Sequence, residues 1–450
     1  MPMENRNKAE APTDTLGTTA PSTGGFAIGT IHRSDFFRGV SVLMGGTIMA
    51  QLIPLLVLPV LSRLYTPESF AVVALVMMVA SIAGPVSTGY YEQAITNPRS
   101  VRRARALAFI AMTCTVLSTL VIIFALCVAH ARIARALTLD DGGLWLYALP
   151  LALCAGSIAN IMNYWLLRAG KHGLQSSVKL LYACCNAALA ITLGTFFSGQ
   201  GLLIGFMGAV TLSTLWGLFS AYRHGMRPTR LPFKRYGLPL MRHYREFPLF
   251  GSLPATLNNI ALQWPLLLIT AHYTLTVAGH FSVIRNLLTG GLMLVALCIG
   301  QVLMKHLNAR IHAGLPLWPF FSKVMAVVAL FGVAGGVMLY TVGPWFLRFY
   351  LGEGWEESGT VLRTLAISSP LVLLGVSLAP ALLALRRIRV MGLWQVFYML
   401  ASLGLLLFVA LPFSQFLGVL VVTECVVYLV YIAAICRCVR QHDQGRTKRG

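Results

Sequence analysis

The sequence is poor in charge, and above all in acidic residues. Only 11% of its 450 residues are charged, with 14 Asp and Glu against 35 Lys and Arg, whereas an ordinary globular domain has about 25% charged residues. A soluble chain with so few charges could not cover its surface with polar groups. The composition, which is 57% hydrophobic, therefore indicates a protein that crosses a membrane many times.

Several chemical motifs are missing as well. The nine cysteines form no CxxC pair and no cluster with histidine, which argues against disulfides and against a bound metal. No GxxxxGK[ST] sequence is present, so ATP is not expected to be the local energy source and no cofactor is predicted. We expect a transporter rather than an enzyme, because the connections predicted outside the membrane are too short for a catalytic domain.

Apolar runs of the length that crosses a bilayer, roughly 20 residues, are the dominant feature. Twelve are found, at about 39–61, 69–91, 106–129, 143–167, 178–197, 200–222, 248–270, 277–304, 319–345, 361–385, 391–412 and 415–436. The sequence thus predicts an all-α integral membrane protein with about 12 transmembrane helices.

The basic residues are concentrated in every second connection between the predicted spans. With the N-terminus inside, 29 of the 35 Lys and Arg fall in cytoplasmic segments, as the positive-inside rule requires. Both termini are therefore predicted to be cytoplasmic. Charge distributed in this way anchors topology and attracts anionic lipids, and it gives no support to nucleic-acid binding.

The longest basic connection divides the spans six and six. Because six is even, both halves start on the same side, and the chain is predicted to form two parallel six-helix bundles around a central cavity. A short match supports the repeat, since Tyr65-Thr66 and Tyr273-Thr274 both follow the first span of a half. The predicted segments are a disordered cytoplasmic tail (1–34), the first bundle (35–222), a basic cytoplasmic linker (223–247), the second bundle (248–437) and a basic cytoplasmic tail (438–450).

Several stretches resemble one family of transporters. The sequence "LPVLSRLYTPESFAVVALV" at 58–76 and "YYEQAI" at 90–95 are similar to the start of Wzx-type polysaccharide flippases. Segments 245–274, 278–303 and 350–370 resemble the second half of the same family in the same order. One departure is Ala71, where the family usually has glycine. These flippases belong to the multidrug/oligosaccharidyl-lipid/polysaccharide exporter superfamily.

The resemblance implies a substrate and a location. It implies an alternating-access carrier that moves undecaprenyl-diphosphate-linked oligosaccharide across the bacterial inner membrane, for exopolysaccharide, capsule or O-antigen biosynthesis. Polysaccharide polymerase and export machinery are further expected partners. The physical requirement agrees, because each unpaired polar group in hydrocarbon costs several kcal/mol and the carrier must supply a polar, preferably cationic, cavity.

Arg285 is the first candidate for the substrate site. It lies about eight residues into a predicted span, where arginine is rare and normally faces a cavity or a partner. A guanidinium group suits diphosphate oxygens, while a structural ion pair or snorkelling to the interface would explain the residue equally well. Asn286 is expected to share the same surroundings.

Two carboxylates are candidates for coupling or for a gate. Glu92 ends the second span and either couples transport to a cation or forms an ion pair with Arg38, Arg102 or Arg103. Glu424 lies near the middle of the last span, where an ionised and unpaired carboxylate would be costly.

Polar faces at helical spacing complete the predicted site. Such faces are expected to line a sugar path or to bond neighbouring helices. They comprise Gln51 with Thr47 and Pro54, Asn160 with Asn163, and Asn259 with Gln263.

Three other functions were weighed against the flippase. A cation-coupled drug or metabolite antiporter of the same superfamily would be favoured by an acid in the first span, and residues 39–61 contain none. A glycan polymerase or ligase needs a large outer loop. A membrane scaffold would not need an intramembrane arginine.

Overall fold

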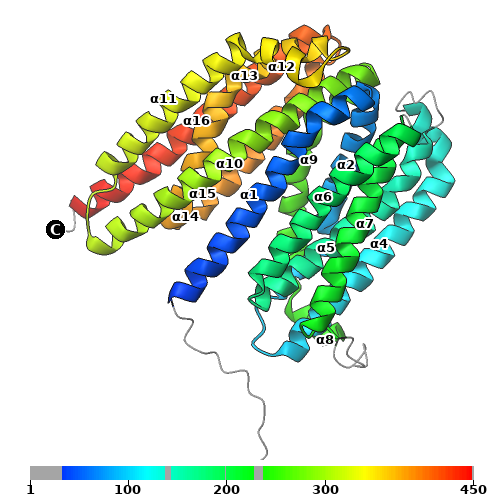
Figure 1. Ribbon diagram of the computed structural model, residues 1–450. Helices are drawn as coiled ribbons and strands as arrows, with labels where there is room; N and C mark the ends of the chain where they lie inside the picture. The colour runs from blue at the N-terminus through cyan, green and yellow to red at the C-terminus, as the bar shows by residue number, and fades with distance from the viewer. Residues whose placement is uncertain (1–32, 137–142, 198, 228–236, 448–450) are drawn as a thin grey trace, which may run out of the picture.

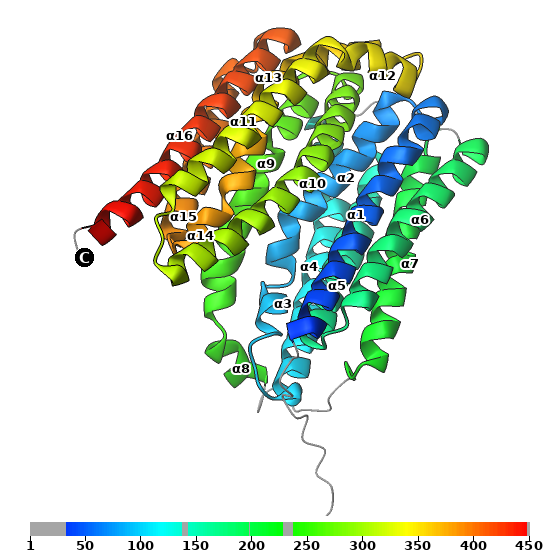
Figure 2. The ribbon, with the colours of Figure 1, turned by 60° about the vertical axis from the view of Figure 1, so that its left-hand side comes forward.

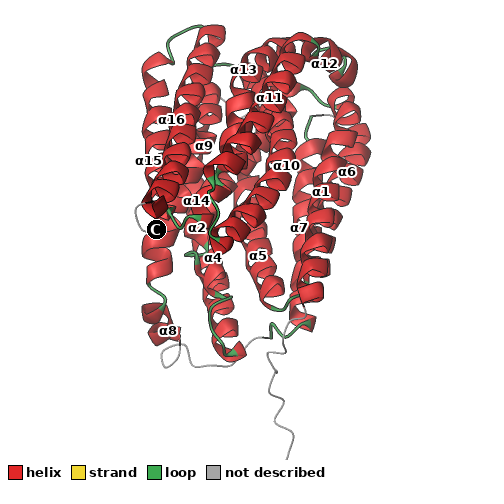
Figure 3. Ribbon diagram, turned by 90° about the vertical axis from the view of Figure 1, so that its left-hand side faces the viewer, coloured by secondary structure: helices red, strands yellow, loops and turns green. Residues whose placement is uncertain are grey.

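The computed structural model describes residues 33–136, 143–197, 199–227 and 237–447. Within these ranges the secondary structure is entirely helical, with no strand (Figure 3). Figure 1 shows the helices of the first half, in blue to green, beside those of the second half, in green to red. The predicted all-α membrane fold is therefore confirmed.

The first half contains six long helices and two short ones. Pro54 and Pro59 lie inside its first helix and Pro85 inside the second. The elements are α1 (Arg33–Leu64), α2 (Pro67–Ser87), α3 (Tyr91–Ala94), α4 (Val101–Ala136), the 3-10 turn η1 (Leu144–Tyr147), α5 (Ala148–Arg168), α6 (His172–Phe196) and α7 (Gly201–Arg223).

The second half repeats this plan with more interruptions. Its elements are α8 (Leu238–His243), the π-helical segment η3 (Phe247–Ser252), α9 (Leu253–His272), α10 (Leu275–Ala313), α11 (Trp318–Thr341), α12 (Gly343–Leu351), α13 (Glu356–Leu378), α14 (Pro380–Ala384), α15 (Ile388–Gly404), the 3-10 turn η4 (Leu405–Phe408) and α16 (Phe413–Thr447). Pro380 begins α14 directly after α13, because proline cannot donate the bond that would continue the helix.

Eleven of the described helices are long and apolar enough to cross a membrane. The predicted span that does not qualify is 248–270, which the structure folds as η3 and α9. Asn258, Asn259 and Gln263 lower the mean hydropathy of α9. Because it packs against α2, α10 and α15, this helix does not depend on lipid contact along its whole length.

The ends of the chain differ in what the structure describes. Residues 1–32 of the predicted tail and 228–236 of the predicted linker lie outside the described residues. At the other end, the predicted tail from Cys438 is helical as far as Thr447, since α16 continues beyond its apolar part.

The two halves are related as the Tyr-Thr match predicts. Thr66 and Thr274 are the N-cap residues of α2 and α10, with φ/ψ of −79°/162° and −78°/155°. The preceding tyrosines also have similar roles: the Tyr65 hydroxyl donates to Ala190 O at 2.6 Å, and the Tyr273 hydroxyl donates to Leu411 O at 2.7 Å. The two halves thus start their second long helices with the same local structure.

Helices α2 and α10 of the two halves come into close contact at their first turns. The side chain of Thr276 on α10 donates a hydrogen bond to Glu68 on α2, and these two positions correspond in the repeat. A Cβ atom on Gly279 would lie 2.0 Å from the carbonyl oxygen of Pro67. The contact therefore requires glycine at position 279, whereas the corresponding position in α2 holds the buried Ala71.

Helix α2 connects the halves over its whole length. It packs against α9 and α10 of the second half and against α5 of the first (Figure 2). The largest buried cluster of apolar side chains includes Leu75 and Met78 of α2 together with Phe281 and Ile284 of α10. The core therefore extends from one half into the other.

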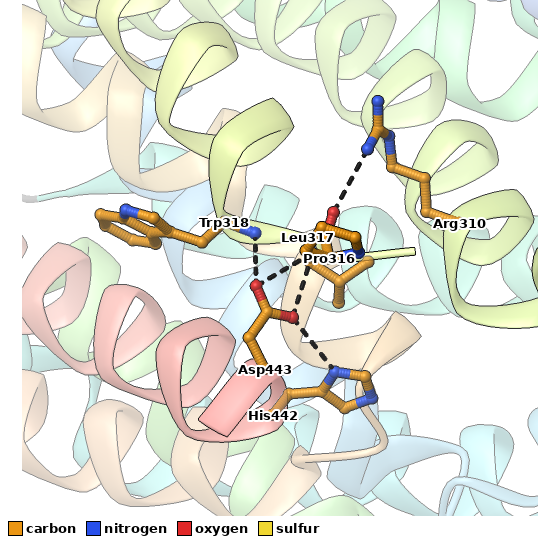
Figure 4. A network of polar contacts seen from close by, with 6 residues as sticks. All are labelled: Arg310, Pro316, Leu317, Trp318, His442 and Asp443. Atoms are coloured by element: carbon orange, nitrogen blue, oxygen red, sulfur yellow. Dashed lines mark hydrogen bonds and ion pairs between the residues drawn. The ribbon is translucent and has the colours of Figure 1, made fainter. Parts of the chain in front are cut away.

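A second set of polar contacts fixes the far end of α16 (Figure 4). Asp443 accepts hydrogen bonds from the backbone N–H groups of Leu317, at 3.0 Å, and Trp318, at 2.8 Å, where α11 begins. These N–H groups have no partner within α11 itself, because the first turn of a helix leaves its donors unpaired. Arg440 lies 4.0 Å above the Trp318 ring, so both side chains attach α16 to α11.

We expect Gly279→Ala to destabilise the protein by about 1–3 kcal/mol, the usual cost of an overpacked site. The added methyl group would displace the backbone of Pro67 and separate the first turns of α2 and α10. Thermal unfolding in detergent micelles measures the loss. Gly291→Ala on the same helix is the control, because a Cβ there meets nothing within 4 Å; equal losses in the two variants would contradict the assignment.

Candidate functional site

One end of the molecule, where α12 lies (Figure 1), is closed by hydrogen bonds between the halves. The Ser62 hydroxyl donates to Leu351 O at 2.7 Å, and the Trp355 indole donates to Ser62 O at 3.0 Å. Arg63 donates to Phe349 O at 3.2 Å, and the Tyr350 hydroxyl donates to Leu55 O. The short helix α12 and the loop after it therefore cover the end of α1.

Two cavities lie between the halves. The larger, which we name the lysine cavity, has a volume of about 880 Å³ and is lined by α1, α2, α5, α6 and α7 of the first half and α10 of the second. The smaller, the glutamate cavity, has a volume of about 790 Å³ and is lined by α2, α5, η3, α9 and neighbouring residues. They share Met77, Gly156, Asn160, Tyr182, Phe206 and Val210, so they are adjoining parts of one central space.

Lys179 is the only charged side chain among the described residues that line the lysine cavity. Its ammonium group donates a hydrogen bond to the Thr47 hydroxyl at 3.0 Å. The surrounding lining is rich in amides, namely Gln51, Asn160, Asn163, Gln175, Asn186 and Asn286. The cavity thus combines one cation with many hydrogen-bonding groups.

The sequence reasoning missed Lys179, because it placed this residue at the edge of a cytoplasmic loop. The structure begins α6 at His172, six residues before the predicted start of that span. Lys179 is therefore two turns inside the helix and faces the cavity. The signal was present in the spacing of Gln175, Lys179, Tyr182 and Asn186, which all line the cavity from one face of α6.

Glu92 lies in the short helix α3 and borders the glutamate cavity. It is the only charged side chain among the described residues that line the glutamate cavity, and it is 5% exposed. One carboxylate oxygen, Oε2, is buried without a hydrogen-bond partner. Burial raises the pKa of Glu92 because the ionised form loses water, while a hydrogen bond from Thr88 acts in the opposite direction.

The expected ion pair of Glu92 is not formed with the arginines whose side chains are described. Arg102 and Arg103 are exposed and make no ion pair with Glu92. The side chain of Arg38, the third possible partner, lies outside the described part of the chain.

Arg285 and Glu424 form an ion pair in which the carboxylate is buried and the Arg285 side chain is 26% exposed. Arg285 Nη1 lies 2.5 Å from Glu424 Oε1, and the Ser368 hydroxyl donates to the other oxygen of Glu424 at 2.9 Å. The side chain of Glu424 is 3% exposed. These contacts join α10, α13 and α16, and they hold the guanidinium group outside the linings of both cavities.

Most residues of the predicted polar faces line one of the two cavities, and Gln263 does not. Gln51, Asn163 and Asn286 line the lysine cavity, and Asn160 lines both cavities. Asn259 lines the glutamate cavity and also donates to Ser81 O at 2.7 Å. Gln263 donates to the Ser81 hydroxyl at 3.5 Å and lies outside both linings, so it bonds α9 to α2.

Within the described ranges, no group of three or more His, Cys, Asp or Glu side chains is placed to hold a metal ion. The two acids of the candidate site are also far apart in the fold, since Glu92 lies on α3 and Glu424 on α16.

We expect Glu424→Leu to lower stability by up to about 3–5 kcal/mol, since it leaves the partly buried Arg285 charge without its partner. Adding Arg285→Met to the same chain should restore most of the loss, because a buried pair replaced by apolar side chains is often neutral. Thermal unfolding of the single and double variants measures both effects. A double variant as unstable as Glu424→Leu alone would mean that the pair is not the source of the loss.

The raised pKa of Glu92 predicts that the stability of the folded protein depends on pH. Burial tolerates the neutral carboxyl better than the ionised one. The contribution of Glu92 to the stability of the protein is therefore fully present below the ordinary glutamate pKa of about 4.3 and is lost as the pH rises through the raised pKa. Glu92→Gln should therefore be more stable than the parent at pH 8, with the difference vanishing near pH 4. Unfolding midpoints across this range test the prediction, and a constant difference would contradict it.

Comparison with solved structures finds membrane transport proteins. A structure of the lipid II flippase MurJ in an inward closed conformation matches with a TM-score of 0.72 at 10% identity, covering 89% of this chain and 87% of that one. An inward-facing multidrug resistance MATE family transporter of the MOP superfamily matches with a TM-score of 0.62 at 14% identity, covering 90% and 95%. At these identities the likeness concerns the fold, which is that of a multi-pass membrane transporter.

Sequence comparison gives the family. No curated protein matches the chain. The profile of the family described as "Polysaccharide biosynthesis protein" matches residues 60–360, about two thirds of the chain. The matched region contains Lys179 and Glu92, the charged residues that line the two cavities, and Ser62 and Trp355 of the closed end. The chain belongs to this polysaccharide biosynthesis protein family.

Proposed function

We propose that this protein is a flippase that moves undecaprenyl-diphosphate-linked oligosaccharide across the bacterial inner membrane by alternating access. Its product would serve the biosynthesis of a surface polysaccharide, and it would act as a carrier without catalysing a covalent step. The observation that carries the proposal is the single lysine among amides in a cavity between two membrane-embedded halves.

Lys179 is placed to bind the phosphates. Its side chain is half-buried and its ammonium group faces the cavity beside Thr47. A lysine ammonium group binds phosphate as a compact charge with three donors. Electrostatic attraction is stronger in this enclosed space than in water, because the local dielectric constant is lower.

The amides around Lys179 suit a sugar chain. Each asparagine or glutamine offers both donors and acceptors, which match the hydroxyl groups of a saccharide. Asn186 Oδ1 is buried without a hydrogen-bond partner. A buried acceptor without a hydrogen bond costs about 1–3 kcal/mol. A ligand hydroxyl could donate the missing hydrogen bond to this oxygen.

Arg285 remains a predicted contact of the diphosphate, together with Asn286. To reach the cavity, its guanidinium group would have to leave Glu424. We therefore assign the first phosphate contact to Lys179, and we assign to the Arg285–Glu424 pair the role of keeping α10, α13 and α16 together.

Alternating access requires the closed end to open in another conformation. The closed end is held by a small number of hydrogen bonds, among them those of Ser62 with Leu351 and Trp355, so these bonds can be exchanged without unfolding a helix. We propose that the α12 end faces the periplasm and the α8 end the cytoplasm, in agreement with the basic residues near α4 and α8. Anionic lipids at those basic loops and the polysaccharide polymerase and export machinery are the proposed partners.

A cation-coupled drug or metabolite antiporter is the second candidate. The observation that favours it is Glu92, an acid that lines a cavity in the same central space. An organic cation would bind there in place of a phosphate. Loss of resistance to cationic compounds on deletion of the gene, without any change in surface polysaccharide, would favour this second function.

Lys179→Met should reduce export of surface polysaccharide by tenfold or more, since a charge-assisted hydrogen bond contributes about 1.5–3 kcal/mol. The measurement is surface polysaccharide in a deletion strain complemented with the variant at the parental expression level. Lys171→Met is the matched control, because Lys171 is exposed just before α6 and lies outside both linings.

Undiminished export with Lys179→Met would remove this residue from the site. Arg285→Ala, examined in the same strain, tests the other cation: if it lowers export while the protein remains stable and Lys179→Met has no effect, Arg285 is the phosphate contact.

A further inference from the structure

The glutamate cavity has the size and the lining of a site for a short oligosaccharide. Its volume of about 790 Å³ falls in the range of small-molecule sites, about 300–1,000 Å³. Tyr90, Tyr164 and Tyr182 supply aromatic rings to it, and Asn160, Asn258, Asn259 and Gln395 supply amides. Sugars offer hydroxyl groups at their edges and C–H groups on their faces, which suit amides and tyrosine rings respectively.

The charge of this cavity selects among sugars. Glu92 is its only charged lining residue in the described part of the chain, and no lysine, arginine or histidine accompanies it there. A uronic acid or another acidic sugar would bring a second carboxylate next to Glu92 without a cation to neutralise either, which is unfavourable. Neutral sugars and sugars that carry a free amine meet no such cost.

Glu92 also has an unused acceptor for such a ligand. Its Oε2 atom is buried and has no hydrogen-bond partner, while the residue as a whole is 5% exposed and borders the cavity. A buried acceptor left unpaired costs about 1–3 kcal/mol. A sugar hydroxyl or ammonium group that reached this oxygen would recover that free energy on binding.

The two cavities together divide the central space by charge. Lys179 lies in one, Glu92 lies in the other, and Asn160, Tyr182 and Phe206 border both. A ligand that fits this arrangement is anionic at one end and neutral or cationic at the other. A lipid-linked saccharide has this form when its diphosphate lies near Lys179 and its sugars extend toward Glu92.

We propose that the glutamate cavity is the subsite for the sugar chain, and that Glu92 restricts the carried oligosaccharide to sugars without acidic groups near the diphosphate. This inference rests on the proposed flippase function and adds the substrate class to it. The positions of the two charged groups, on α6 and α3, fix the direction in which the ligand lies.

The test uses the purified full chain in detergent micelles and four synthetic ligands. These are a short-chain polyprenyl diphosphate without sugar, and the same lipid bearing a neutral N-acetylhexosamine, a hexosamine with a free amine, or a hexuronic acid. Calorimetry measures each Kd. We expect the neutral and amine-bearing sugars to tighten binding about tenfold over the bare lipid, the equivalent of one good hydrogen bond to a charged group, and the uronic acid to weaken it.

Glu92→Gln should remove the discrimination. In this variant the uronic acid ligand should bind as well as the neutral and the amine-bearing ligands. Glu246→Gln is the matched control, because Glu246 is an exposed acid outside both cavities. If Glu92→Gln does not fold, Gln395→Leu serves instead, with the expectation that it weakens binding of all three sugars and leaves the bare lipid unchanged.

The outcomes separate the two proposals. If no polyprenyl diphosphate binds, the flippase proposal fails. If the bare lipid binds but its Kd is unaffected by Lys179→Met, Lys179 is not the phosphate contact and the proposed placement of the ligand in the two cavities is overturned. If the bare lipid binds through Lys179 but the uronic acid ligand binds the parent as tightly as the neutral one, the proposed sugar subsite is overturned while the flippase function stands.

Discussion

The close contact between the first turns of α2 and α10 is the interaction on which the rest of the structure depends. Gly279 allows the backbone of α10 to approach Pro67, and the hydrogen bond between Thr276 and Glu68 joins equivalent positions of the two halves. Because the halves meet there and along α2, the central space is enclosed between them. The extended buried core and the lysine cavity both include residues of α2 and α10 on either side of this line of contact.

The cost of charge in a membrane explains where the ionisable groups lie. Arg285 and Glu424 neutralise each other at a distance of 2.5 Å, which is the usual arrangement for charged groups buried among helices. Lys179 and Glu92 are different, since each borders a cavity without an opposite charge beside it. A protein keeps such groups at some cost to its stability, and the natural explanation is a ligand that supplies the missing charge or hydrogen bond.

Much of the fold could be predicted from the sequence, and less of the site. The number of spans was close to that observed because bilayer thickness sets the length of an apolar run, and α9 fell short only because its amides lower its hydropathy. Glu424 was expected to need a partner, and Arg285 was expected either to bind phosphate or to form a pair. Their mutual contact could not be predicted, since they lie 139 residues apart.

The sequence by itself determined the class of the protein, its repeat and its family resemblance, because these depend on composition, periodicity and local motifs such as Tyr65-Thr66 and Tyr273-Thr274. Only the tertiary structure decided which polar groups face the same space. A misplaced helix start was enough to hide Lys179, because the direction of a side chain depends on the helix that carries it. Whether a charge is paired or available for a ligand depends on helices distant in the sequence, and packing alone brings those helices together.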